Sequence, residues 1–203
     1  MPIVVKKNDV TTKTKTGLFF GSFNPIHNGH LMIASYMAEY TDLKEVWFIV
    51  SPHNPLKEKA TLLADHHRLA MANIAVEDDP RFRASNIEFH LPQPSYTIDT
   101  LTYISEKYPE KEFVLITGSD TLPSFHKWKN YEQLLEHYHL YIYPRPLCGS
   151  SPFDNHLHIH FTASPLIEIS SSFIRESIKQ GKNMRHFLPE KVWKYIEEMH
   201  FYR

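Results

Sequence analysis

The feature that most constrains this chain is an apolar run, residues 17–20, that leads directly into Gly-Ser-Phe-Asn-Pro-Ile-His-Asn-Gly-His at residues 21–30. A strand that stops at a Gly/Pro turn and restarts as a helix leaves several backbone N–H groups unpaired beside the positive end of the helix dipole, where phosphates bind. His27 and His30 lie three residues apart, so they share one helix face, and each can donate a hydrogen bond or carry a proton near neutral pH. Taken alone, the His-x-x-His spacing fits equally well a capping histidine followed by a surface histidine. Its position after a strand favours a phosphate site.

The composition indicates one folded domain that acts on small molecules. The chain has 203 residues, of which 42% are hydrophobic and 13% aromatic, enough for one substantial core. Its formal net charge of −1 supplies no basic field for a long nucleic acid. The expected partners are therefore small-molecule substrates, not nucleic acid or a membrane, and a homo-oligomer is left open. A single cysteine, Cys148, excludes an internal disulfide and suits a reducing cytoplasm.

The first residues differ from the rest in composition. Residues 1–15 are polar and rich in Lys and Thr, and they lack the apolar stretch of a signal peptide or a membrane anchor. We expect a flexible N-terminal leader over residues 1–15 and a single domain over residues 16–203.

Apolar, β-branched runs alternate along the chain with stretches of helical spacing, which is typical of a parallel sheet with helices on both faces. We predict an α/β fold, a Rossmann-like three-layer sandwich with a mostly parallel sheet, whose ligands bind beyond the carboxyl ends of the strands. The predicted strands are residues 18–20, 46–50, 113–117, 140–143 and 158–162, with 81–90 as a further candidate, and the predicted helices are 31–38, 62–76 and 97–107.

A second helix start follows Ile169. Ser170 or Ser171 precedes an apolar-periodic run and is predicted to be its N-cap. Arg175 lies about one turn further, where its guanidinium can reach an anion bound at the same helix start. The cap role alone would also explain the serines. Two helix starts that hold one polyphosphate are the sharper hypothesis.

Three further segments carry candidate residues. The strand at 113–117 leads into Gly118 and Asp120, whose carboxylate can accept hydrogen bonds from a ribose or cap the next helix. Trp128 is favoured as a core residue by its spacing, with stacking on a flat ring as the alternative. Residues 51–59 contain two prolines and two lysines and predict a mobile loop over the same rim.

Together these segments resemble the bacterial nicotinate mononucleotide adenylyltransferases, within the nucleotidyltransferase superfamily that carries a His-x-Gly-His and an Ile-Ser-Ser signature. The resemblance covers nearly the whole chain after Thr16. The histidine signature identifies only the superfamily, whereas other segments point to the pyridine-nucleotide branch. These are Pro-Ser-Tyr-Thr-Ile-Asp-Thr-Leu at 94–101, Gly-Ser-Asp at 118–120 with Trp128, and Tyr-Pro-Arg-Pro at 143–146.

The resemblance implies adenylyl transfer from ATP to nicotinic acid mononucleotide, which gives nicotinic acid adenine dinucleotide (deamido-NAD) and pyrophosphate, with Mg²⁺ and without a covalent enzyme intermediate. Such a transfer requires in-line positioning and charge neutralisation more than a protein nucleophile. The catalytic residues that the resemblance implies are His27, His30, Arg175 and Lys57, the last in the mobile loop near the β- and γ-phosphates.

The resemblance also implies two binding sets. Trp128 would stack on the pyridine ring, and the backbone N–H groups of Thr97 and Lys129 would meet the nicotinate carboxylate, an acceptor-only group. ATP would be bound by Gly21, Ser22, Phe23, His27, Gly29, His30, Gly118, Asp120, Ile169, Ser170, Ser171 and Arg175. The mononucleotide would be bound by Ser22, Asn24, Lys57, Tyr96, Thr97, Asp120, Trp128, Lys129 and Arg145.

The chain departs from the family pattern at two positions. Phe20 precedes Gly21 where the family usually has Gly-Gly, and Asn24 replaces a common Asp, which removes a negative charge near the triphosphate.

Other functions stay open on the sequence. They are an adenylyltransferase for nicotinamide mononucleotide or another phosphorylated acceptor, such as phosphopantetheine or glycerol phosphate, and a non-catalytic NAD-sensing module. A histidine-cluster metal protein is disfavoured, because the alternation of His156, His158 and His160 marks one face of a strand.

Overall fold

The computed structural model describes residues 13–52, 62–146 and 148–203. Most of the predicted leader, residues 1–12, lies outside the described residues. The first strand begins at Thr14, inside the span assigned to the leader.

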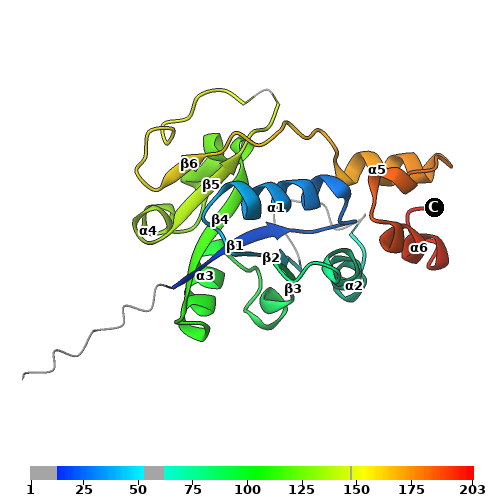
Figure 1. The fold of residues 1–203 in the computed structure, drawn as a ribbon, viewed down its shortest axis with the longest axis horizontal. Helices are drawn as coiled ribbons and strands as arrows, with labels where there is room; N and C mark the ends of the chain where they lie inside the picture. The colour runs from blue at the N-terminus through cyan, green and yellow to red at the C-terminus, as the bar shows by residue number, and fades with distance from the viewer. Residues whose placement is uncertain (1–12, 53–61, 147) are drawn as a thin grey trace, which may run out of the picture.

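The elements alternate as expected for an α/β chain (Figure 1). In order they are β1 (Thr14–Gly21), α1 (Asn28–Tyr40), β2 (Glu45–Val50), α2 (Asp65–Val76), β3 (Phe82–Ser85), η2 (Ile87–His90), α3 (Thr97–Lys107), β4 (Lys111–Gly118), η3 (Ser119–Lys127), α4 (Tyr131–His137), β5 (His139–Tyr143), β6 (Ile159–Phe161), α5 (Ser171–Lys179), η4 (Arg185–Phe187) and α6 (Glu190–Glu198).

The six strands form one sheet in the order β3-β2-β1-β4-β5-β6, and every pairing is parallel. β1 is central, and Leu18 pairs with Trp47 of β2 on one side and with Leu115 of β4 on the other. From β1 the chain adds β2 and then β3 on one side of the sheet, and it then crosses to the other side of β1 to add β4, β5 and β6. The carboxyl ends of β1 and β4 therefore form the topological switch point, where ligands bind in open α/β sheets.

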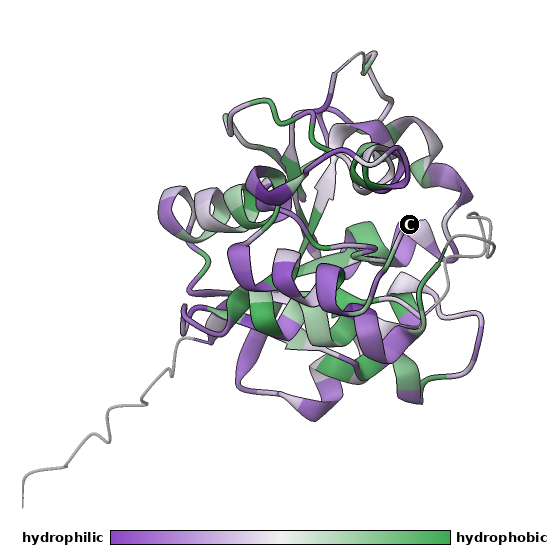
Figure 2. Cartoon of the chain, turned by 90° about the vertical axis from the view of Figure 1, so that its right-hand side faces the viewer, coloured by the Kyte–Doolittle hydropathy of each residue, from purple (hydrophilic) through white to green (hydrophobic). Residues whose placement is uncertain are grey.

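Two hydrophobic clusters cover the two faces of the sheet, and adjacent residues of one strand enter opposite clusters. Phe48 of β2 packs on one face with α1, α2, α5 and α6, and Trp47 packs on the other with α3 and α4. Five of the six residues of β2 are buried, as expected for a parallel strand covered on both faces. Figure 2 shows hydrophobic and hydrophilic residues interleaved along the helices, which fits helices with one buried stripe.

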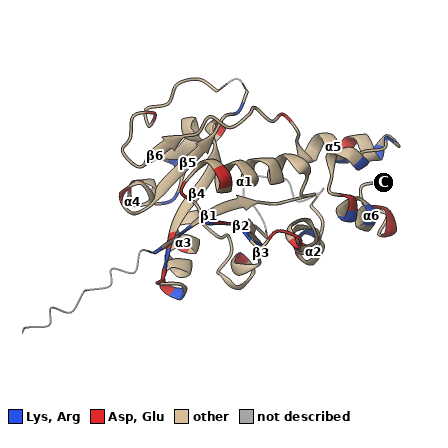
Figure 3. Ribbon diagram, viewed as in Figure 1, with Lys and Arg blue, Asp and Glu red and all other residues tan. Residues whose placement is uncertain are grey.

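Charges of both signs lie on the outer helices (Figure 3), in agreement with the formal net charge of −1. Among the helices in the described parts of the chain, none is long and apolar enough to cross a membrane.

The predicted strands are confirmed with shifted boundaries, and the third helix, Thr97–Lys107, is confirmed with the predicted bounds. α1 begins at Asn28, three residues before the prediction, and α2 begins at Asp65, three residues after it. One strand over residues 81–90 is wrong: β3 ends at Ser85, and η2 follows after Asn86. The side chains of Ile87 and Glu88 are buried there, so tertiary packing overrides the strand propensity.

Candidate active site

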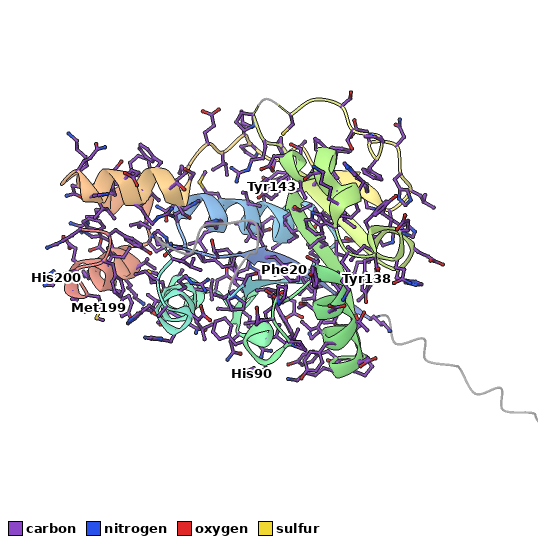
Figure 4. All side chains as sticks on the ribbon, turned by 180° about the vertical axis from the view of Figure 1, so that it is seen from behind. Phe20, His90, Tyr138, Tyr143, Met199 and His200 are labelled. Carbon is purple, nitrogen blue, oxygen red and sulfur yellow. The ribbon has the colours of Figure 1, made fainter. Side chains whose placement is uncertain are left out.

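A cavity of about 410 Å³ lies at the switch point between β1 and β4. Phe20 and Tyr143, both labelled in Figure 4, line it from β1 and β5. The departure at Phe20 therefore places an aromatic side chain at the cavity, partly packed on the core. The other lining residues are Gly21, Ser22, Ser51, Glu88, Ser95, Tyr96, Thr97, Leu115, Ile116, Thr117, Gly118, Asp120, Thr121, Lys127, Trp128 and Lys129.

The two signature histidines stack at the start of α1. Their ring centroids lie 3.7 Å apart, with the planes inclined by 22°. His27 is the extended N-cap residue, and its backbone N–H donates to Nδ1 of His30 at 3.2 Å. Gly29 makes this packing fit, since a Cβ there would lie 3.0 Å from Nδ1 of His27. The two rings thus share one helix face, as the spacing predicts.

Burial changes the protonation of His27. His27 is only 4% exposed, and burial, with a smaller contribution from the charge of Arg145, lowers its pKa to about 3. Its Nδ1 is buried without a hydrogen-bond partner in the described parts of the chain. Of the two roles that the sequence leaves open for His27, burial favours the hydrogen bond over the proton, because desolvation opposes the charged form. A neutral His27 offers a hydrogen bond rather than a charge.

The turn between β1 and α1, residues 22–27, is named here the phosphate turn. Phe23 has a φ of +45°, and its ring lies in the core against Phe19, Phe48 and His30. A Cβ on Gly21 would lie 2.9 Å from that ring. Because the Phe23 side chain is buried, only its backbone is left to meet ATP, the role that the resemblance implies for it.

Asn24 also faces the interior and is 2% exposed. Its Oδ1 accepts the backbone N–H of Leu63 at 3.3 Å and the hydroxyl of Tyr202 at 2.8 Å. The implied contact with the mononucleotide therefore does not come from this oxygen, which lies beneath the phosphate turn.

The second predicted helix start lies against the same turn. Ser170 is the N-cap of α5, and its Oγ accepts the Phe173 N–H at 3.2 Å. Ser171 Oγ donates to the Pro25 carbonyl at 2.9 Å, and Arg175 Nη1 donates to the Asn24 carbonyl at 2.8 Å. The structure thus brings the starts of α1 and α5 together across 146 residues of sequence or more.

The start of α3 and the end of η3 form another part of the cavity wall. Tyr96 and Thr97 lie at the first, Trp128 and Lys129 follow the second, and all four line the cavity. An ion pair of 2.8 Å between Lys129 Nζ and Asp99 links the two segments, and Lys129 also lies over the Tyr96 ring. Trp128 packs on Phe125, with ring centroids 5.2 Å apart, and still lines the cavity. Trp128 is thus partly buried against the core, and stacking on a flat ring stays a prediction.

Asp120 and Arg145 lie near the end of β4. Asp120 lines the cavity with an exposed side chain, 3.9 Å from Nε of Arg145. Arg145 Nη1 donates to the carbonyl of Ile167 at 3.2 Å, so it connects this rim to the segment that leads through Ile169 into α5. The carboxylate does not cap η3, whose N-cap is Gly118.

The sequence interpretation missed Arg68, which is fully buried. Its guanidinium donates to the carbonyls of Ser22 at 2.6 Å, Ser51 at 2.7 Å and Pro52 at 2.9 Å, and it pairs with Asp65. Arg68 thereby joins the ends of β1 and β2. Its position in a helical stretch is equally typical of a solvent-exposed arginine, so no local pattern identifies it.

It also missed Glu88, a cavity-lining carboxylate that is 3% exposed. Thr100 Oγ1 donates to it at 2.8 Å. Burial raises the pKa of Glu88, and hydrogen bonds from the hydroxyls of Ser51, Thr100 and Ser95 oppose that rise in part. Glu88 therefore connects β2, η2 and α3 at the cavity.

Lys57, with most of its loop, lies outside the described residues.

His158 and His160 both contact His139, but His156 and His158 precede the three-residue β6, so the alternation extends beyond the strand. No group of three or more His, Cys, Asp or Glu within the described ranges is arranged to hold a metal ion.

Comparisons with known proteins agree with this geometry. The family described as cytidylyltransferase-like matches residues 18–177. The chain is 56% identical over 191 residues to a probable nicotinate-nucleotide adenylyltransferase of Christiangramia forsetii, covering 93% of this chain and 98% of the relative. It is 54% identical to the protein of the same description in Flavobacterium psychrophilum, covering 93% and 99%.

A solved structure has a similar fold. It is the Plasmodium falciparum nicotinic acid mononucleotide adenylyltransferase complexed with NaAD, with a TM-score of 0.78 and 20% identity over 93% of this chain and 97% of that one.

Proposed function

Because this chain belongs to the cytidylyltransferase-like family and, within it, to the nicotinate-nucleotide adenylyltransferases, we propose that the residues described above carry out that family's reaction at the β1/β4 cavity. The enzyme is a nucleotidyltransferase of NAD biosynthesis that converts ATP and nicotinic acid mononucleotide into nicotinic acid adenine dinucleotide and pyrophosphate. The assignment of roles to individual residues is the proposal.

The observation that carries the proposal is the meeting of two helix starts at one turn. Ser171 of α5 donates a hydrogen bond to the carbonyl of Pro25, two residues before His27. Arg175 donates one to the carbonyl of Asn24, three residues before His27. Backbone N–H groups at both helix starts, with the positive ends of both helix dipoles, would then face one triphosphate. Arg175 already lies at that place with a delocalised charge suited to phosphate.

The reaction would proceed by direct in-line attack of the mononucleotide 5′-phosphate on the α-phosphate of ATP, with pyrophosphate as the leaving group. Charge on the transferred phosphate would be stabilised by hydrogen bonds from the histidine pair and by Arg175. His27 would act as a neutral donor, since its pKa lies far below neutral pH. The protein would contribute positioning and electrostatics, and no covalent intermediate is required.

The acceptor would bind at the part of the cavity wall near α3 and η3. Trp128 would stack on the pyridine ring, Asp120 would accept from a ribose hydroxyl, and the N–H groups of Thr97 and Lys129 would meet the nicotinate carboxylate. Donors alone satisfy a carboxylate, whereas the amide of nicotinamide presents two N–H groups that also need acceptors. The ion pair of Lys129 with Asp99 supports this role, because it holds the two donor segments together.

Mg²⁺ would enter as part of the ATP substrate. The carboxylates that line the cavity are Asp120 and Glu88, and Glu88 is occupied by hydroxyl donors. Mg²⁺ typically binds substrate phosphates together with one or two carboxylates, so this lining fits an ion held mainly by the triphosphate. We place the single-domain enzyme in the cytoplasm, where one cysteine suits a reducing compartment.

The test is pyrophosphate release at matched concentrations of nicotinic acid mononucleotide, nicotinamide mononucleotide and phosphopantetheine, each with ATP and with CTP. We expect turnover with ATP and nicotinic acid mononucleotide above every other pair. Turnover only with phosphopantetheine would overturn the acceptor assignment. Tight NAD binding without pyrophosphate release would favour a sensing module.

A further inference from the structure

The C-terminal tail returns to the phosphate turn. After α6 the backbone adopts left-handed conformations at His200, with a φ of +55°, and at Tyr202, with a φ of +65°. The Tyr202 hydroxyl then donates to Oδ1 of Asn24 at 2.8 Å, across 178 residues of sequence. Figure 1 shows the C-terminus at the same end of the molecule as α5 and α6, and Figure 4 labels His200 in the tail.

Asn24 is where four parts of the chain meet. Its backbone carbonyl accepts from Arg175 of α5, and its Oδ1 accepts from Leu63, which precedes α2, and from Tyr202. The adjacent Pro25 carbonyl accepts from Ser171. A shift of Asn24 would therefore move the turn and also the guanidinium that faces the triphosphate.

The Tyr202 contact is an enclosed hydrogen bond, not a surface contact. Asn24 is 2% exposed, and burial raises the pKa of the Tyr202 hydroxyl, against the opposing charges of Arg175 and Arg68. The hydroxyl therefore stays protonated and donates. A bulky residue with positive φ is strained and persists only where its surroundings hold it. The bond to Asn24 is one such restraint.

We propose that Tyr202 is a positioning residue for ATP: its hydroxyl, acting through Asn24, holds the phosphate turn in the geometry at which the starts of α1 and α5 meet. The inference rests on the proposed function and deepens it. It also accounts for Asn24, because a neutral amide oxygen accepts both Tyr202 and Leu63 without adding a negative charge beneath the triphosphate.

The experiment compares two isosteric variants, Tyr202→Phe and Tyr195→Phe. Tyr195 is the matched control, since its hydroxyl forms a hydrogen bond with Nδ1 of His67 at 2.8 Å, between α6 and α2. We expect Tyr202→Phe to raise the KM and the Kd for ATP by about 3- to 10-fold, the range for one lost hydrogen bond. The KM for the mononucleotide should stay within about twofold, and Tyr195→Phe should change neither KM.

Asn24→Ala, alone and combined with Tyr202→Phe, tests the route of the effect. If Tyr202 acts through Asn24, adding Tyr202→Phe to Asn24→Ala changes the ATP affinity no further. An unchanged ATP affinity in Tyr202→Phe would overturn the proposal. Equal losses of ATP affinity in Tyr202→Phe and Tyr195→Phe, in proportion to their losses of melting temperature, would also overturn it. Calorimetric ATP binding distinguishes failure of this proposal from failure of the proposed function. A wild-type protein that binds ATP without pyrophosphate release would contradict the proposed function. The comparison of the Kd values for ATP would still decide the role of Tyr202.

Discussion

The phosphate turn is buried and receives hydrogen bonds from several distant segments. The part of the cavity wall at the start of α3 and the end of η3, called the rim below, is half exposed and is built from side chains on short segments. Phe23, Asn24 and His27 are each at most 4% exposed. At the rim, Tyr96 is 39% exposed, and the Lys129–Asp99 ion pair that links the two segments is an exposed contact of small expected energy.

This difference fits the different demands of the two substrates. The triphosphate requires fixed donors in one geometry, because misplacement by about 1 Å has a large effect on rate. The acceptor requires discrimination between similar ring substituents, which a few exposed groups can provide. We therefore expect changes in the turn to affect stability and turnover, and changes in the rim to affect the KM of the acceptor.

The largest effect is expected at Arg68, which joins the ends of β1 and β2. Arg68→Leu should lower the free energy of unfolding by about 3–5 kcal/mol, because it removes the buried guanidinium that donates to the carbonyls of Ser22 and Ser51. Chemical denaturation measures this loss. A loss below about 1 kcal/mol would mean that the turn does not depend on this buried side chain.

His30 tests the turn in the chemical step. His30→Ala should lower kcat by about 10²-fold or more, the scale of one lost transition-state donor, with the fold intact. Pyrophosphate release in single turnover checks the rate, and circular dichroism checks the fold. Near-normal turnover would refute the histidine site.

His27 gives the phosphate turn a pH dependence. Its pKa of about 3 in the folded state lies below the ordinary 6.5, so the folded state binds fewer protons, and stability is full above pH 6.5 and falls as the pH is lowered toward 3. Between pH 7 and pH 5 this single group should cost about 2 kcal/mol. His27→Asn measured in parallel should lose this part of the slope; identical slopes would contradict the neutral assignment.

Trp128 tests the rim. Trp128→Ala should raise the KM for nicotinic acid mononucleotide by about tenfold, the scale of a lost stacking contact, and leave the KM for ATP unchanged. Steady-state kinetics with each substrate varied in turn measures both constants. An equal rise in the KM for ATP and in the KM for the mononucleotide would show that Trp128 does not act on the acceptor alone.

The sequence alone predicted those features that depend on local order. The apolar run before Gly21, the pair His27 and His30, and the Ser170 cap with Arg175 one turn later are readable because strand, helix and cap preferences act over a few residues. The alternation of strands and helices likewise predicted the parallel sheet and the carboxyl edge as the site.

Only the tertiary structure decided the burial, the hydrogen bonds and the pKa shifts of the site residues. The lowered pKa of His27, the buried bonds of Arg68 and Glu88, and the contact between Tyr202 and Asn24 all depend on groups far apart in the chain. Desolvation and hydrogen bonding in a core are set by which segments pack together, and the spacing of residues along the chain carries no record of that packing.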